Sequence, residues 1–410
     1  MSGGPSAGIK LSQEKLARAA LTYLAEPADP ALGALLAICE PAEVLAAIKA
    51  DMLPGTGPGC GDTPASRAAL ERALGRWRVR LPGLPDAQGI AGACREDIRL
   101  IGPGDAEWPG ALDQLGPARP YALWLCGNAD LRFACSRSVS MVGSRAATGY
   151  GGHVAGEIAA DLGERGWAIV SGGAYGIDAA AHRGALAAEA VTIAVLACGV
   201  DYPYPAGHAD LFAAIAAHGL VISEWPPGRH PGRIRFLVRN RVIAALGCGT
   251  VIVEAGERSG ALNTARHAAN LGKPLMAVPG PVTSAQSAGC HRIIREWGAS
   301  CVTRAADIIE LLSPLSVPDA LAPGGGPEPA YPPGTDPGSD PDSPSRDDLD
   351  ADSARVLDAL PARGGAGTST IAVDAGVDLD TVLRCLGRLA GYGFIERCDR
   401  GWRLRRPSRR

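Results

Sequence analysis

Short, uninterrupted apolar segments alternate with longer segments of mixed polarity between residues 138 and 297. Apolar runs of this length, rich in Val, Ile, Leu and Ala, are typical of parallel strands buried on both faces. The pattern predicts an α/β fold in which helices, joined by right-handed crossovers, cover both faces of a parallel sheet. The predicted strands are 139–142, 168–171, 192–197, 220–223, 250–254 and 274–278, and the predicted helices are 151–164, 177–188, 208–217, 234–246, 261–271 and 288–297.

The flanking regions follow other patterns. Short amphipathic helices, such as 12–24 and 42–48, are separated by Gly and Pro and predict a small helical domain over 1–95. The α/β domain is then expected over 96–312. Pro, Gly, Ser and Asp dominate 313–353, which is typical of a disordered linker.

Residues 354–410 predict a compact C-terminal domain. Three amphipathic helices are followed by two short strands around 399–401, which is the order of elements in a winged helix. This region holds eleven Arg against six acidic residues, so its formal charge is +5.

Composition narrows the class of protein. The 410 residues are 46% hydrophobic and 20% charged, as in a globular protein, and the net charge of −3 indicates no partner. Eleven scattered Cys form no CxxC pair, so we expect reduced thiols and neither a metal nor a cofactor. With no secretory signal at the start, and with Glu40 and Glu43 interrupting the apolar stretch 31–48, a cytoplasmic protein without a membrane span is expected.

Glycine-rich turns follow two predicted strands directly. Glycine lets the backbone approach an anion, and a helix N-terminus offers free N–H groups. Arg145 adds a bidentate phosphate donor. The alternative is that these glycines serve only the geometry of the turns. The candidate binding residues here are Gly143, Ser144 and Arg145 in the first turn and Ser171, Gly172, Gly173 and Tyr175 in the second.

An arginine-rich run follows the fourth predicted strand. Five Arg, at 229, 233, 235, 239 and 241, occur with no acidic residue between them. We interpret them as unopposed charges that suit a polyphosphate backbone, with a merely solvated basic face as the alternative. Helical spacing places Arg235 and Arg239 on one face. The candidates are Arg235, Arg239, Asn240 and Arg241, joined by Ser259 and Gly260 at the start of a further helix.

Catalytic patterns are scarce. Glu254 ends a predicted strand, yet no partner base or metal cluster accompanies it, and HExxH, Walker A and GxSxG motifs are absent from the sequence. GSRAATG departs from the dinucleotide-binding spacing GxGxxG. Asp178 is interpreted as a helix-capping residue and His182 as a packed polar residue. We therefore predict a binding protein and not an enzyme.

Together, seven segments resemble the DprA/Smf family (DNA-processing protein A) in order and spacing. They are GSR at 143–145, SGGAYGIDAAAH at 171–182, GVDYPYP at 199–205, SEWPPG at 223–228, FLVRNRVIAAL at 236–246, VIVEAGERSGALNTA at 251–265 and AVPGP at 277–281. The resemblance implies an extended Rossmann-like fold with a helical (SAM- or helix-hairpin-helix-like) N-terminal domain. It also implies a homodimer that binds and protects single-stranded DNA and loads the RecA recombinase in natural transformation.

The resemblance also assigns residues. Arg145 matches the family's phosphate-binding arginine, Arg239 to Arg241 match its RNR motif, and Ser171 to Gly173 match its second anion-binding turn. Two positions depart from the pattern. Tyr175 stands where many relatives carry a basic residue, although its ring can stack on a base. His208 stands where relatives often have Asn, and it can still donate a hydrogen bond.

Two other functions remain open on the sequence. A nucleoside-monophosphate phosphoribohydrolase would use Glu254 and Arg239, but it needs a PGGxGT-type turn, whereas this chain has only Gly249-Thr250 before the strand. A double-strand DNA regulator would act through the winged helix, with Arg384 and Arg388 entering a groove.

Overall fold

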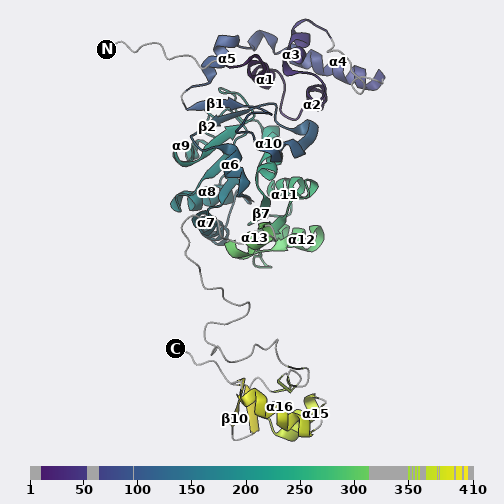
Figure 1. The fold of residues 1–410 in the computed structure, drawn as a ribbon, viewed down its shortest axis with the longest axis vertical. Coiled ribbons are helices and arrows are strands. Elements are labelled where there is room, and N and C mark those ends of the chain that lie inside the picture. Colours follow the sequence, from purple (N-terminus) through teal and green to yellow (C-terminus); the bar gives the residue numbers. More distant parts are fainter. Residues whose placement is uncertain are drawn as a thin grey trace, which may run out of the picture. The chain divides into compact units, whose positions relative to one another are not determined.

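The computed structural model describes residues 11–52, 64–95 and 97–313 and, with gaps, residues 350–404. The chain divides into two compact units, the first ending and the second beginning between residues 313 and 350 (Figure 1). The predicted linker over 313–353 lies almost wholly outside the described residues. The domain boundaries given above therefore stay predictions.

A nine-stranded sheet forms the centre of the first unit (Figure 1). Its strand order is β1-β2-β6-β5-β4-β3-β7-β8-β9, and all pairs from β6 to β9 are parallel. The six predicted strands are confirmed and are parallel to one another. The strands are β1 (Ile98–Ile101), β2 (Leu123–Cys126), β3 (Ser138–Val142), β4 (Ala168–Ser171), β5 (Thr192–Val195), β6 (Leu220–Ser223), β7 (Gly249–Ile252), β8 (Leu275–Ala277) and β9 (Ser300–Cys301).

The prediction of a purely parallel sheet is wrong at one edge, where two further strands pair antiparallel. β1 and β2 pair antiparallel with each other, and β2 pairs antiparallel with β6. Both strands are only four residues long, and the hydrophobic pattern did not predict either of them. The sheet is therefore mixed, with an antiparallel extension beside β6.

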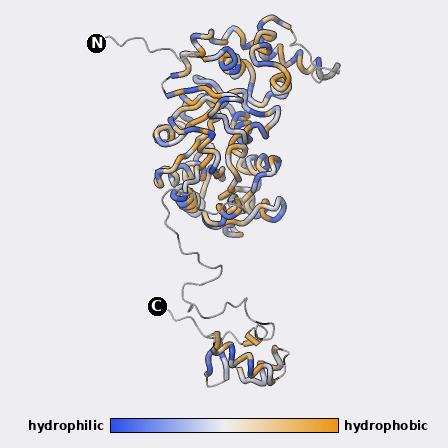
Figure 2. Tube along the Cα trace, in the orientation of Figure 1, coloured by the Kyte–Doolittle hydropathy of each residue, from blue (hydrophilic) through white to orange (hydrophobic). Residues whose placement is uncertain are grey.

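Helices cover both faces of this sheet, as predicted. Neighbouring residues of one strand enter opposite cores: Met141 packs with α7 and α8, whereas Val142 packs with α10 and α11. Apolar positions run through the interior of the unit and polar positions lie mainly along its outline (Figure 2). The helices are α6 (Leu131–Ser136), α7 (Gly149–Glu164), α8 (Ile177–Ala187), α9 (Ala209–His218), α10 (Arg233–Leu246), α11 (Ala261–Asn270), α12 (Ala288–Trp297) and α13 (Ala305–Leu312), with short 3-10 turns at Leu81–Gly83, Gly110–Ala118 and Ala206–His208.

Of the five N-terminal helices, α1 and α5 pack directly on the antiparallel edge. Ala19, Ala20 and Ile90 share a core with Leu100 of β1 and Trp124 of β2, so these helices cover strands that would otherwise expose apolar surface. The predicted helices 12–24 and 42–48 are confirmed. The five helices are α1 (Gln13–Leu24), α2 (Pro30–Leu36), α3 (Pro41–Lys49), α4 (Pro64–Arg78) and α5 (Ala87–Ala93).

The second unit contains two helices and a hairpin among its described residues. They are α15 (Thr368–Ala375), α16 (Leu379–Gly391), β10 (Ile395–Cys398) and β11 (Gly401–Leu404). β10 and β11 pair antiparallel, which confirms the predicted hairpin. The first predicted helix of this region falls on residues that are only partly described, so the winged helix stays a prediction. In the described part of the chain, no helix is both long and apolar enough to cross a membrane.

Candidate functional site

The strand order reverses at β3, which has β4 on one side and β7 on the other. In open α/β sheets, ligands bind at the carboxyl ends of the strands where this reversal occurs. A cavity of about 560 Å³ lies at this point, between the turn after β3 and the helices α10 and α11. Its lining residues are Val142, Gly143, Ser144, Arg145, Ala146, Ala174, Asp178, Arg233, Phe236, Leu237, Arg239, Asn240, Ile243, Ser259, Gly260, Ala261 and Thr264.

Glu254 builds the turn after β3 and is itself outside the lining of the cavity. The backbone N–H of Ser144 donates to the Glu254 carbonyl over 2.7 Å. The Glu254 carboxylate accepts from the Thr148 backbone N–H at 2.9 Å and from the Thr148 hydroxyl at 2.6 Å. Thr148 in turn caps α7 by accepting from the Gly151 N–H. Glu254 is thus a buried positioning residue, 2% exposed, that fixes the turn.

Two exposed arginines flank the cavity. The Arg145 guanidinium lies over the Phe236 ring, 5.1 Å from its centre. Neither Arg145 nor Arg233 forms an ion pair or side-chain hydrogen bond with any described residue. Asp178 is the one acidic side chain in the lining, against Arg145, Arg233 and Arg239. The cavity therefore carries an excess of positive charge and two guanidiniums with free donors.

Arg239 forms part of the cavity wall, although it is only 4% exposed. It donates to the carbonyl oxygens of Gly172 and Val195, and its buried Nε has no partner among the described residues. Burial lowers the pKa of Arg239 to about 10, so it stays charged at neutral pH. A side chain at Gly172 would overlap the guanidinium, which explains the glycine at that position.

The second predicted anion-binding turn is occupied by the protein itself. The N–H groups of Gly172 and Ala174 donate to the Asp178 carboxylate at 3.2 and 3.3 Å. Burial raises the pKa of Asp178, while Arg239 and these two N–H groups oppose the shift. Ser171, Gly172 and Gly173 lie outside the cavity lining, and the Ser171 hydroxyl donates to the carbonyl of Met141.

The interpretation of the arginine run as unopposed is wrong for Arg235 and Arg241. Arg241 is buried and donates to both carboxylate oxygens of Glu224 at 2.6 Å. Arg235 donates to Glu26 over 2.9 Å and stacks on the Trp225 ring. The acidic partners come from other parts of the chain, so an absence of acids within the run did not leave the run unpaired. Neither Arg235 nor Arg241 lines the cavity.

The remaining candidates separate into two groups. Asn240, Ser259 and Gly260 line the cavity, and Asn240 donates to the Asn263 side chain at 3.2 Å. Tyr175 lies outside it, 52% exposed, with its ring centre 4.5 Å from that of His208. His208 is buried, and its ring nitrogen lies 3.0 Å from the Gly173 carbonyl.

Four residues of α10 that line the cavity, Arg233, Phe236, Leu237 and Ile243, were not among the predicted binding residues. Arg233, Phe236, Leu237, Asn240 and Ile243 line it from α10. Their spacing of three and four residues defines one face of a helix, and this spacing was the signal that could have found Arg233 and Phe236. No group of three or more His, Cys, Asp or Glu suited to a metal ion occurs among the described residues.

Fold and site together define a Rossmann-like protein with a cationic cavity at the switch point of its sheet. Residues 99–313 match the family model described as DNA recombination-mediator protein A. The chain is 42% identical over 398 residues to the DNA processing protein DprA of Mycobacterium tuberculosis, covering 95% of this chain and 94% of that protein. It therefore belongs to the DNA recombination-mediator protein A (DprA/Smf) family, as the seven segments predicted.

Comparisons with Streptococcus pneumoniae also match DprA. DprA of Streptococcus pneumoniae is 39% identical over 203 residues, which cover 49% of this chain and 70% of that protein. The X-ray structure of DNA processing protein A from S. pneumoniae aligns with a TM-score of 0.58 and 29% identity, over 74% of this chain and 99% of that one. The similarity extends beyond the α/β core.

Proposed function

We propose that this protein binds single-stranded DNA at the cavity beside β3 and β7, without catalysing a reaction on it. The observation that carries the proposal is that Arg145 and Arg233, which have no ion-pair partner among the described residues, line the cavity together with Phe236. A free guanidinium binds phosphate through two parallel hydrogen bonds. Phe236 lies under the guanidiniums of Arg145 and Arg239, and an aromatic ring beside a phosphate-binding arginine can accept a base of any sequence by stacking. Alternating phosphates and bases are the repeating features of a single strand.

The hydrogen bonds made by the carboxylates of Glu254 and Asp178 support binding over catalysis. Both carboxylate oxygens of Glu254 accept from Thr148, and Glu254 lies outside the cavity lining. Asp178 accepts from two backbone N–H groups of its own turn. A phosphoribohydrolase that relied on Glu254 would need this residue to face its substrate, so the enzymatic alternative is the weaker proposal.

The binding set that we propose is smaller than the predicted one. It consists of residues that line the cavity: Gly143, Ser144, Arg145, Arg233, Phe236, Asn240, Ser259 and Gly260. Arg239 supports the cavity wall. Arg241 and Arg235 act elsewhere, the first in holding α10 to Glu224.

Family membership supports further proposals for the whole chain. We propose that it acts as a cytoplasmic homodimer that loads RecA onto the bound strand during natural transformation. The basic C-terminal region, with its formal charge of +5, is a candidate for a separate contact with duplex DNA. Removing residues 350–410 separates single-strand binding by the cavity from duplex binding by the C-terminal region. Single-strand affinity should survive the deletion if the cavity binds the strand.

A binding titration tests the proposed site. Labelled oligo-dT and a duplex of equal length are titrated by fluorescence anisotropy with the unmodified protein and with Arg145→Ala. Since a hydrogen bond to a charged group contributes about 1.5–3 kcal/mol, Arg145→Ala should weaken single-strand binding roughly 10- to 100-fold. Arg165→Ala, which removes an exposed arginine paired with Asp161, is the control. Preference for the duplex, or unchanged affinity in Arg145→Ala, would contradict the proposal.

A further inference from the structure

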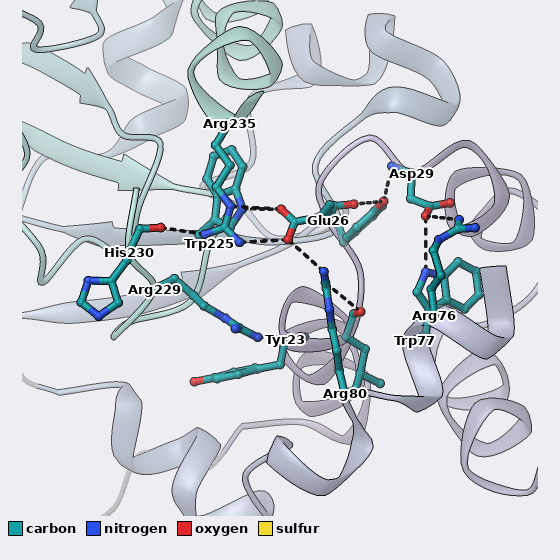
Figure 3. Close-up of polar contacts among 12 residues, drawn as sticks. Tyr23, Glu26, Asp29, Arg76, Trp77, Arg80, Trp225, Arg229, His230 and Arg235 are labelled. Carbon is teal, nitrogen blue, oxygen red and sulfur yellow. Dashed lines mark hydrogen bonds and ion pairs between the residues drawn. The ribbon is translucent and has the colours of Figure 1, made fainter. Parts of the chain in front are cut away.

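A second group of arginines lies where the N-terminal helices meet the segment before α10. We name Arg80, Arg229, Arg235, Tyr202 and His230 the arginine–tyrosine patch. Figure 3 shows the side chains of Arg80, Arg229 and Arg235 converging on the region around Glu26. None of the five lines the cavity beside β3.

Glu26 is the acid at the centre of this group. Its carboxylate accepts from Arg235 at 2.9 and 3.2 Å, from Arg80 at 3.2 Å and from the Trp225 indole at 3.1 Å (Figure 3). One carboxylate thus serves two guanidiniums and an indole. Arg80 remains 40% and Glu26 43% exposed at the side chain, so the group is open to solvent.

Arg229 has no carboxylate within ion-pair distance among the described residues. It donates to the Tyr23 carbonyl at 2.8 Å and lies over the Tyr23 ring. Burial, and to a lesser extent the neighbouring Arg235 and Arg80, lower the pKa of Arg229, while Glu26 and Tyr23 oppose the shift. An anion held at this point would compensate the partly buried charge of Arg229.

The charge balance stays positive when all neighbouring acids are counted. Asp201 lies nearby, where its carboxylate accepts from the Gly228 N–H at 2.8 and 3.0 Å. Asp29 is paired with Arg76. Three guanidiniums, of Arg80, Arg229 and Arg235, then face the two carboxylates of Glu26 and Asp201.

Aromatic rings lead from the cavity towards this patch. Phe236, in the cavity wall, has its ring centre 5.6 Å from that of Tyr204. Two residues earlier, Tyr202 lies 4.8 Å from His230, the neighbour of Arg229. Tyr202 is 37% and Tyr204 43% exposed, so both rings present surface to solvent. Exposed rings interleaved with arginines are the surface on which proteins bind single strands without sequence preference.

We propose that the arginine–tyrosine patch is a second contact site for single-stranded DNA, with phosphates on Arg229 and Arg80 and a base on Tyr202. A strand that leaves the cavity past Phe236 reaches it along Tyr204 and continues onto the N-terminal helices. This inference rests on the proposed function, because it extends the strand bound in the cavity.

The test compares oligonucleotide lengths on the full chain. The double variant Arg80→Gln/Arg229→Gln removes two proposed phosphate contacts. An oligo-dT of about 6 residues, near the lower end of known single-strand site sizes, should bind it within about twofold of the unmodified protein, and one of about 25 should bind at least about tenfold more weakly. For the long oligomer, the slope of log K against log salt should become less negative by about 1.4, at about 0.7 for each single-strand phosphate contact. Arg76→Gln, four residues before Arg80 and outside the patch, removes an arginine that is paired with Asp29; it is the matched control and should change neither.

Tyr202→Leu supplies an independent readout, because among the described residues the ring contact with His230 is the one interaction given for its side chain. It should weaken long-oligomer binding at least about fivefold and leave the salt slope unchanged, since stacking releases no counterion. If the double variant and Tyr202→Leu both bind the long oligomer as tightly as the unmodified protein does, the second site is overturned while the cavity proposal stands. Failure of the unmodified protein to bind either oligomer would overturn the cavity proposal and the second site with it.

Discussion

The rim and the wall of the cavity use the same residue type for different purposes. On the rim, Arg145 and Arg233 are exposed and have no ion-pair partner among the described residues. In and behind the wall, Arg239 and Arg241 are each 4% exposed and donate to carbonyl oxygens or to Glu224. A guanidinium that is buried must have partners, since removing them leaves an uncompensated charge. An exposed one is stabilised by water and remains available to a ligand.

This contrast assigns stability to the wall and affinity to the rim. Arg233 and Arg241 belong to one helix, eight residues apart, and face different surroundings. Burial and the position of the nearest carboxylate decide the role of each arginine. Variants of the wall should therefore change the free energy of unfolding, and variants of the rim should change DNA binding.

The largest expected effect is that of Arg241→Ala. It leaves the buried Glu224 carboxylate without its partner, which should cost about 3–5 kcal/mol of the free energy of unfolding. Urea unfolding followed by circular dichroism measures this, with Arg165→Ala as an exposed control expected to cost less than about 1 kcal/mol. An Arg241→Ala protein that unfolds normally but has lost single-strand binding would place Arg241 on the binding surface instead.

Gly172→Ala tests the packing of Arg239 with a smaller change. The added methyl group would overlap the guanidinium and should cost about 1–3 kcal/mol, as is usual for overpacking. Gly152→Ala, on α7 with open space around it, is the matched control and should stabilise by about 0.5–1 kcal/mol. Equal stability of the two variants would show that Arg239 is not fixed against the turn.

His182, buried beside this wall, predicts a dependence of stability on pH. The Thr192 hydroxyl donates to the Ile169 carbonyl, so the His182 Nδ1–H donates to Thr192. Burial, with a contribution from Arg239, lowers the pKa of His182 to about 3. Below pH 6.5 the unfolded chain binds a proton that the folded protein excludes, so stability should fall by about 1.4 kcal/mol per pH unit as pH drops towards 3.

Unfolding at pH 7 and pH 5 measures the His182 contribution as about 2 kcal/mol. His182→Asn retains a donor for Thr192 and cannot titrate, so it should lose less stability over this interval. The comparison also cancels the contribution of Asp178, whose raised pKa acts in the opposite direction. Identical pH profiles for the two proteins would contradict the buried neutral state of His182.

The sequence predicted the central sheet well for a physical reason. Strands such as β3 and β4 are buried on both faces, and only continuous apolar runs satisfy that environment. β1 and β2 were not predicted because they are short and because their partners are set by the topology of the edge, which no local pattern encodes. The turn after β3 was predicted because its glycine allows a close backbone approach and its arginine is a phosphate donor, and both features are visible in the local sequence.

The arginine run could be found from sequence, but the sequence could not show which of its arginines are paired with acids elsewhere in the chain. Glu26 lies 209 residues before Arg235, and Glu224 lies 17 residues before Arg241. A search for acids within the run therefore sees neither partner. The spacing of Arg233, Phe236 and Asn240 does carry the information, because residues three or four apart share one face of a helix.

The salt dependence of single-strand binding by the rim variant Arg145→Ala/Arg233→Ala tests the division between rim and wall most directly. Each phosphate contact with a single strand contributes about −0.7 to the slope of log K against log salt. The double variant should therefore show a slope less negative by about 1.4, with an unfolding free energy within about 1 kcal/mol of the unmodified protein. An unchanged slope and affinity in a stably folded double variant would show that the strand binds elsewhere.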